Sequence, residues 1–208
     1  MPLNHAISNV GPQTRNLAVV SADLKSVIRT PQSLTRYLLL MNQTYDSILG
    51  LRAIRAFQDR PVSEPDLNAL LEAARWTGSS KNVQSWSFVV VDDPAQKDAI
   101  CSAGDFMTPV ENAPMVICLV ENPSGSEFDT GRLAQNIMLA ADTLGLATCP
   151  VTLHRDEVAS DVLGLPDGYR CRYGVAVGHP TGAKVTSKFG GRRPMEELVH
   201  RNRFGSAE

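Results

Sequence analysis

Several features that mark common protein classes are missing from this chain of 208 residues. Its apolar runs near the N-terminus, Leu17–Val20 and Leu38–Met41, are much shorter than a membrane span, and the first is too short for the core of a signal peptide. The 20 basic and 22 acidic residues leave a net charge of −2, which is unfavourable for binding nucleic acid through its phosphates. We therefore predict a soluble, cytoplasmic protein with no membrane and no nucleic-acid partner. Any bound anion must then be held by a local cluster of positive charge.

The four cysteines and four histidines are too scattered to form the usual metal-binding motifs. No two cysteines have the Cys-x-x-Cys spacing, and no two histidines fall within one helical turn. The cysteines are therefore expected to be reduced thiols, most of them buried. The chain also lacks a Gly-x-Gly-x-x-Gly fingerprint after a strand and a Gly-x-Ser-x-Gly nucleophile elbow. We predict no metal site and no catalytic side chain; if the chain is an enzyme, a cofactor supplies the reactive atom.

What the chain does contain is enough apolar residue, 43% of the total, to form a sizeable core. At about 150 residues per domain, its length predicts one domain with an appendage. Pro12 and Pro31 interrupt any regular period in residues 1–44. We predict that these residues form an N-terminal extension that packs on a partner subunit, and that residues 45–208 form the main domain.

Hydrophobic periodicity in the main domain alternates between helix and strand. A helix is predicted to start after Ser63, because Ser63 is a good N-cap and Leu67, Leu70 and Ala74 follow at helical spacing. Further helices are predicted at Leu133–Leu144, with Gly145 after the C-cap, and at Asp156–Leu163. Short apolar runs bounded by turn residues predict strands at Ser87–Val91, Met115–Val120, Ala147–Val151 and Tyr173–Val177. This alternation predicts an α/β or α+β fold around one sheet.

Four segments combine charged or polar residues with neighbouring apolar runs: Leu51–Phe57, Gly78–Trp86, Arg132–Leu153 and Gly190–Val199. In this order and at these separations they resemble the nitroreductase family of FMN-dependent oxidoreductases, over about residues 45–204. The resemblance implies an α+β nitroreductase-like fold with a mixed central sheet flanked by helices. It also implies a homodimer that holds FMN in clefts at its interface.

Two pairs of arginines are candidates for binding the FMN phosphate. Arg52 and Arg55 are three residues apart, so on a helix they would be neighbours able to grip one phosphate, although a solvated basic face is the commoner interpretation of such a pair. Arg192 and Arg193 follow two glycines and, by the resemblance, join the same phosphate. For this pair, the alternative is a basic loop without a ligand.

The first segment departs from the family pattern at two positions. The family commonly has Arg-Arg-Ser where this chain has Leu51, Arg52 and Ala53, so one positive charge and one hydroxyl are missing. A charge-assisted hydrogen bond contributes about 1.5–3 kcal/mol. Because these two groups are missing, we expect either a weaker affinity for the phosphate or a greater contribution from the C-terminal arginines.

Polar side chains between the first predicted helix and strand are candidates for contacts with the isoalloxazine ring. Ser80, Asn82 and Gln84 supply a hydroxyl and two carboxamides, which complement the alternating carbonyl and N–H groups of a flavin. An ordinary polar turn is the commoner interpretation of such a loop taken alone. By the resemblance, Asn82 is the leading candidate.

Two further parts of the third segment are candidates through the resemblance. Pro150, Val151, Thr152 and Leu153 would lie along one face of the flavin, with a backbone N–H directed toward N5; a plain connection between strand and helix is the alternative. Gln135 and Asn136, on the apolar helix, are either flavin contacts or part of hydrogen bonds between helices.

The resemblance implies a function as well as a site. NAD(P)H would reduce the flavin and a small acceptor, such as a nitro compound or a quinone, would reoxidise it in a ping-pong sequence, while the protein orients the flavin and tunes its potential. Two alternatives stay open at this point. The chain could be an FMN-dependent oxidase or dehydrogenase that desaturates a small metabolite, or a non-catalytic flavin-binding relative.

Overall fold

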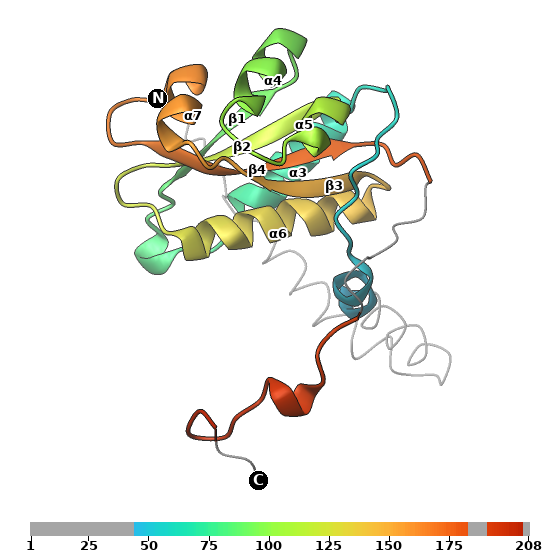
Figure 1. Cartoon of the computed structure of the whole chain (residues 1–208), viewed down its shortest axis with the longest axis vertical. Coiled ribbons are helices and arrows are strands. Elements are labelled where there is room, and N and C mark those ends of the chain that lie inside the picture. Colours follow the sequence, from blue (N-terminus) through green and yellow to red (C-terminus); the bar gives the residue numbers. More distant parts are fainter. Residues whose placement is uncertain (1–43, 183–190, 206–208) are drawn as a thin grey trace, which may run out of the picture. The chain divides into compact units, whose positions relative to one another are not determined.

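The computed structural model describes residues 44–182 and 191–205 (Figure 1). The contacts between residues divide the chain into two units, with the boundary after Leu51. The predicted N-terminal extension lies outside the described residues, apart from residue 44. A helix over residues 44–50 comes before the division, and the main body begins at Arg52.

A four-stranded sheet forms the centre of the described body. Its strands are β1 (Trp86–Val91), β2 (Met115–Glu121), β3 (Ala147–Thr152) and β4 (Arg170–Gly178), in the order β1-β2-β4-β3. Every neighbouring pair is antiparallel, whereas the resemblance implied a mixed sheet. The physical reason is that β4 lies between β2 and β3, which run in the same direction and would otherwise have been parallel neighbours.

Helices cover both faces of this sheet. In Figure 1, α4 (Pro94–Cys101), α5 (Thr108–Asn112) and α7 (Asp156–Leu163) lie over one face, and α6 (Glu127–Thr143) crosses the other. The first helix of the body, α3 (Glu64–Arg75), packs on α6. The α+β class predicted from the sequence is therefore confirmed.

The predicted local signals have their expected structural roles. The Ser63 hydroxyl accepts a hydrogen bond from the Asp66 N–H and caps α3. Gly145 follows the C-cap of α6 with a φ of +70°, a conformation that glycine adopts without strain. The predicted strands and α7 are confirmed, with β4 longer than expected. Sequence periodicity missed α4 and α5, because helices this short carry no long apolar stripe.

The core follows the two-residue period of the central strands. All seven residues of β2 are buried, as expected for a strand covered on both faces. Val116, Cys118 and Val120 join the cluster that also contains residues of α4, α5 and α7. The alternate side chains, including Ile117 and Leu119, point to the opposite face, where α6 packs. Both faces of the sheet are thereby covered by helices, which leaves its edges as the parts that can be reached by a ligand.

The four cysteines are free, and Cys118, Cys149 and Cys171 are buried, which confirms the prediction of reduced and mostly buried thiols. A hydrogen bond with Cys118, together with burial, raises the pKa of Cys171. Within residues 44–182 and 191–205, no three metal-ligating side chains gather in one place. No helix in these ranges has the length and apolar character required to cross a membrane.

Candidate functional site

The first predicted segment is extended, and the prediction that Arg52 and Arg55 share a helix face is wrong. The Ile54 N–H donates to the Thr148 carbonyl at 2.8 Å, and Phe57 forms a bridge with Pro180. The helix over 44–50 ends before this segment, because the chain from residue 52 on pairs with β3 and with the residues after β4 and does not continue as a helix. In extended chain, residues two apart share a side, so Arg55 shares its side with Ala53 and not with Arg52.

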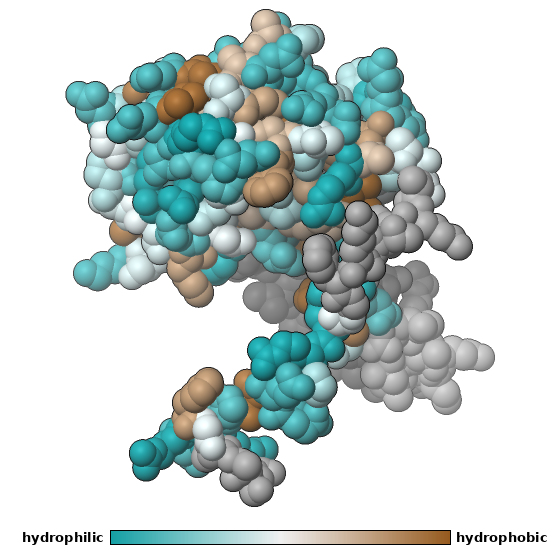
Figure 2. All heavy atoms as spheres, viewed as in Figure 1, coloured by the Kyte–Doolittle hydropathy of each residue, from teal (hydrophilic) through white to brown (hydrophobic). Residues whose placement is uncertain are grey.

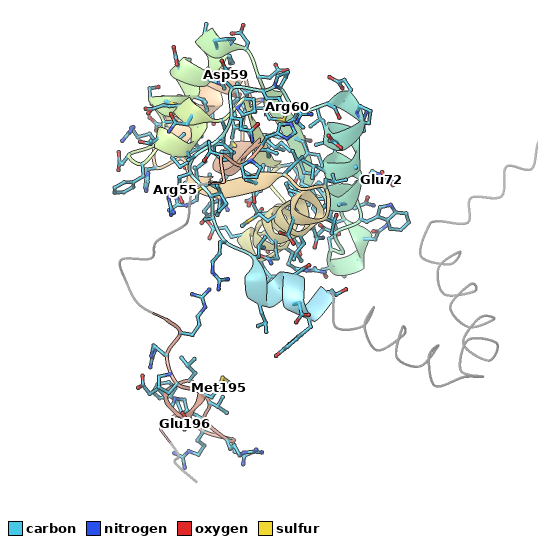
Figure 3. All side chains as sticks on the ribbon, turned by 90° about the vertical axis from the view of Figure 1, so that its right-hand side faces the viewer. Arg55, Asp59, Arg60, Glu72, Met195 and Glu196 are labelled. Carbon is cyan, nitrogen blue, oxygen red and sulfur yellow. The ribbon has the colours of Figure 1, made fainter. Side chains whose placement is uncertain are left out.

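The segment delivers positive charge to the edge of β3. Both Arg52 and Arg55 are exposed, while Ala53 is partly buried against the core. Arg55, labelled in Figure 3, is close enough to Cys149 to oppose the rise in that thiol's pKa that burial causes. The charge of Arg55 therefore lies beside β3, one residue before Pro150.

The last part of the third segment, β3, forms one edge of the sheet. In an antiparallel strand, alternate residues bond to one neighbour and the others face away from it. Leu153 donates its N–H to the Arg172 carbonyl, so it faces β4, whereas the Thr148 carbonyl faces outward and accepts from Ile54. By this alternation Pro150 and Thr152 also face outward. Pro150 has no N–H, so the next outward N–H along β3 is that of Thr152.

The predicted ring-contact loop has an unusual backbone. Ser80–Asn82 form the single turn η1 between α3 and β1, and Ser80, Asn82 and Gln84 are exposed. Lys81, Asn82 and Gln84 have φ values of 51°, 56° and 50°, a region that costs about 1–2 kcal/mol for most side chains and is adopted more readily by asparagine. The Gln84 N–H donates to the Ser79 hydroxyl at 2.9 Å and closes the loop. Strained backbone of this kind is concentrated at functional sites.

Side chains of α6 hold the start of this loop in place. Arg132 donates to the Gly78 carbonyl at 2.6 Å, and the Asn136 amide donates to the Thr77 hydroxyl at 2.7 Å. For Asn136, a hydrogen bond between elements is therefore the correct interpretation. Gln135, the neighbouring candidate, is exposed on the same helix.

The C-terminal arginines lie in the segment 191–205, which follows residues outside the description. Arg192 and Arg193 are both exposed. Arg193 donates to the Glu197 carboxylate at 3.0 Å and to the Glu197 carbonyl at 3.2 Å. A phosphate would therefore compete with a carboxylate for this guanidinium.

The structure gathers the predicted residues into two groups, which lie at opposite edges of the sheet. Residues 52–55 meet Thr148 and the following part of β3, while residues 79–84 lead into β1. Three strand spacings, about 14 Å, separate β3 from β1. A single chain therefore presents the two groups apart from each other.

A cavity lies at the end of the first segment, beyond its candidate ligands. It has a volume of about 460 Å³ and is lined by residues 56–59 together with Lys97 and residues 111–114. Lys97 donates to the Ala113 carbonyl at 2.7 Å, so its ammonium already has an acceptor. None of the predicted ligand residues lines this cavity.

Sequence patterns missed the roles of residues whose side chains bind the backbone of a distant loop. Arg132 and Arg155 both bind main-chain carbonyls of distant loops. Their partners are more than 50 positions away in the chain, and no spacing pattern identifies such contacts. Phe106, 80% exposed, was missed as well; it packs edge-on against His154. On the face drawn in Figure 2, apolar residues form separate patches among hydrophilic ones.

Comparison with known proteins gives a consistent result. A family model described as the nitroreductase family matches residues 48–103 and 107–179. The FMN reductase (NADPH) of Bacillus subtilis (strain 168) is 29% identical over 190 residues, which cover 79% of this chain and 75% of the relative. The oxygen-insensitive NADPH nitroreductase of Salmonella typhimurium is 28% identical over 184 residues, with coverage of 79% and 75%.

Solved structures agree with these matches. Nitroreductase A from Vibrio parahaemolyticus superposes with a TM-score of 0.70 at 26% identity, and the match covers 79% of this chain and 77% of that one. The family match includes the first three predicted segments, while residues 190–199 lie beyond its end.

Proposed function

The chain belongs to the nitroreductase family, and we propose that it is an FMN-dependent oxidoreductase driven by NAD(P)H. Its acceptors would be small molecules such as nitro compounds or quinones, reduced in a ping-pong sequence in the cytoplasm. The names of the relatives, an FMN reductase (NADPH) and an NADPH nitroreductase, favour NADPH as the donor. When bound, FMN supplies the redox chemistry, taking a hydride from the nicotinamide and passing electrons to the acceptor.

The observation that carries this proposal is the outer edge of β3. The Thr152 N–H faces away from β4 and is available to a flavin nitrogen, while Pro150, Val151 and Leu153 fix the course of the chain beside it. A backbone donor needs no particular side chain, so the threonine side chain of residue 152 is not required for this contact. The edge therefore fits a planar, hydrogen-bonding ring.

The phosphate of FMN is assigned to positive charge at one end of this edge. Arg55 lies beside β3, and Arg52 and Ala53 are in the same extended segment. Arg192 and Arg193 would complete the cluster from the C-terminal segment. Replacing Arg192 and Arg193 together by Ala is expected to strip FMN while the protein stays folded, as measured by flavin fluorescence and circular dichroism. Unchanged FMN affinity in this variant would remove the C-terminal assignment.

We assign the ring's polar edge to Ser80, Asn82 and Gln84, with Gln135 nearby on α6. Because these residues are about three strand spacings from β3, we propose that a second copy of the chain supplies them to the site. The active form would then be a homodimer with FMN between the subunits, to which residues 1–44 also contribute contacts.

Mixing two defective variants tests this arrangement. Arg55→Ala and Asn82→Ala are each expected to lose FMN when expressed alone, since each removes one contact from every site. In co-expressed protein, half-and-half dimers would carry one intact site, so about a quarter of all sites should recover FMN. If one chain builds a whole site, co-expression recovers nothing and the shared site is wrong.

A spectrum of the purified protein tests the function itself. We expect flavin absorbance, and rapid anaerobic bleaching when NADPH is added. Bound flavin that NADPH does not bleach would instead indicate an oxidase or dehydrogenase. Protein that neither carries nor takes up FMN would indicate a non-catalytic relative.

A further inference from the structure

The loop between α4 and α5 comes very close to the outer edge of β3. Gly104 is buried, and a Cβ built on it would lie 2.9 Å from the Thr152 carbonyl oxygen and 2.8 Å from the Met107 Cγ. Only a glycine allows this approach. The loop backbone therefore rests directly on the residue whose N–H is assigned to the flavin.

One arginine holds this loop through four hydrogen bonds. Its backbone N–H donates to the Ala103 carbonyl at 2.9 Å. The guanidinium donates to the carbonyls of Ser102 and Gly104, both at 2.7 Å, and to the Asp105 carboxylate at 2.6 Å. This residue, Arg155, thus binds four consecutive residues of the loop. It lies three positions after Thr152.

The neighbouring groups reinforce the same contact. The hydrogen bond from Arg155 lowers the pKa of Asp105, because it stabilises the charged carboxylate. The Asp105 N–H in turn donates to the His154 Nδ1 at 3.3 Å. The loop is therefore attached to both residues that follow Leu153.

Arg155 is poorly suited to the other role that its position offers. It is the N-cap residue of α7, where Ser, Thr, Asp or Asn would stabilise the helix by about 1 kcal/mol. Its side chain makes no capping hydrogen bond. The side chain instead serves the loop 102–105 alone, although it is 44% exposed.

We propose that Arg155 is a positioning residue, which fixes the loop 102–105 against Thr152 and thereby aims the Thr152 N–H at the flavin. This inference rests on the proposed function, since it requires FMN beside β3. Without the guanidinium, the loop would lose three of the five hydrogen bonds that join it to His154 and Arg155, and the Thr152 carbonyl would lose its close neighbour. The N–H of the same residue would then lose its fixed direction.

The test uses the full-length protein loaded with FMN. In Arg155→Gln, the midpoint potential and the visible spectrum of the flavin should shift. The rate of anaerobic reduction by NADPH should fall about tenfold or more, as expected for a displaced contact at a reacting centre. FMN affinity should change much less, because the phosphate contacts remain. Arg155→Lys, which keeps the charge and part of the bonding, should recover part of the rate.

Arg75→Gln is the matched control. Arg75 is an exposed guanidinium that also makes two hydrogen bonds, both to Glu72 within α3. Its replacement should leave potential, spectrum and rate unchanged. A purely structural role for Arg155 would lower the midpoint of thermal unfolding without altering the flavin of the folded protein.

Each result decides between the two proposals. Wild-type protein that binds no FMN overturns the proposed function. Wild-type protein with FMN, combined with an unaltered potential, spectrum and rate in Arg155→Gln, overturns the positioning role alone. If Arg155→Gln does not fold, Arg155→Lys is judged by the same criteria.

Discussion

The two regions assigned to the flavin differ in the kind of group that they offer. At the outer edge of β3, the assigned donor is the Thr152 backbone, held by hydrogen bonds and by the close approach of Gly104. In the loop before β1, the assigned groups are exposed side chains on a backbone with three positive φ values. The first region is fixed by packing, and the second is a strained loop held by two side chains of α6.

This difference predicts how substitutions act in the two regions. A backbone donor depends on the course of the chain and is insensitive to side-chain substitution. Side-chain donors disappear with the residue. Substitutions near β3 are therefore expected to act through packing, and substitutions in residues 79–84 through the loss of individual contacts.

The largest effect is expected where the β3 region is most tightly packed. Gly104→Val places a branched side chain against the Thr152 carbonyl and Met107, which should destabilise the protein by about 1–3 kcal/mol. Urea denaturation measures this difference. Gly131→Ala is the control, since nothing lies within 4 Å of a Cβ in this helical position, and it should stabilise by about 0.5–1 kcal/mol. Equal stability of the two variants would contradict the close contact.

A smaller effect is expected at the anchors of the loop before β1. Asn136→Ala leaves the Thr77 hydroxyl without its donor, which should cost about 0.5–1.5 kcal/mol of stability and weaken FMN binding. Gln135→Ala, one position away and exposed, should leave stability unchanged. If Gln135→Ala nevertheless weakens FMN binding, Gln135 contacts the flavin directly; titration of apoprotein with FMN distinguishes the two cases.

Relief of backbone strain should raise the stability of the protein, whereas the preceding variants lower it. Lys81→Gly is expected to stabilise the protein by about 0.5–1 kcal/mol, because glycine adopts a φ of 51° without a steric penalty. Lys81→Ala keeps the strain and removes the side chain, so it should not stabilise. Thermal unfolding of both variants gives the comparison, and destabilisation by glycine would show that the strain is absent.

The smallest effect is expected at the surface of α3. Hydrogen bonds from Arg75 and Trp76 lower the pKa of Glu72 from 4.5 to about 2. The stabilisation is therefore complete above pH 4.5 and is lost as the pH falls through about 2. Glu72→Gln should be slightly less stable than wild type at pH 7, and the difference should vanish near pH 2. A difference that persists there would exclude the ion pair as its cause.

Local patterns predicted the elements of the fold and less of their arrangement. The Ser63 cap, the Gly145 terminus and the apolar runs of β1 and β2 lie within short stretches of chain, so sequence alone indicated them. The antiparallel order of the sheet depends on β4 entering between β2 and β3. That step is decided by tertiary packing, which periodicity does not encode.

The candidate site shows the same limit. The helical spacing of Arg52 and Arg55 was misleading, since the pairing of Ile54 with Thr148 overrides the local preference for helix. Asn136 was recognised as a buried carboxamide in need of a partner, but only the fold identifies Thr77 as that partner. Arg155 gave no signal, because its contacts are to main-chain carbonyls some 50 residues away.

Pro150 has a further consequence for the protein in concentrated solution. An exposed edge strand is a template for strand addition by another chain, and this is a common route to aggregation. On the outer side of β3, the Thr148 carbonyl is already paired with Ile54, Pro150 has no N–H to offer, and Gly104 packs against the Thr152 carbonyl. An incoming strand would thus find no continuous ladder, so the edge proposed to hold the flavin is protected from amyloid-like pairing.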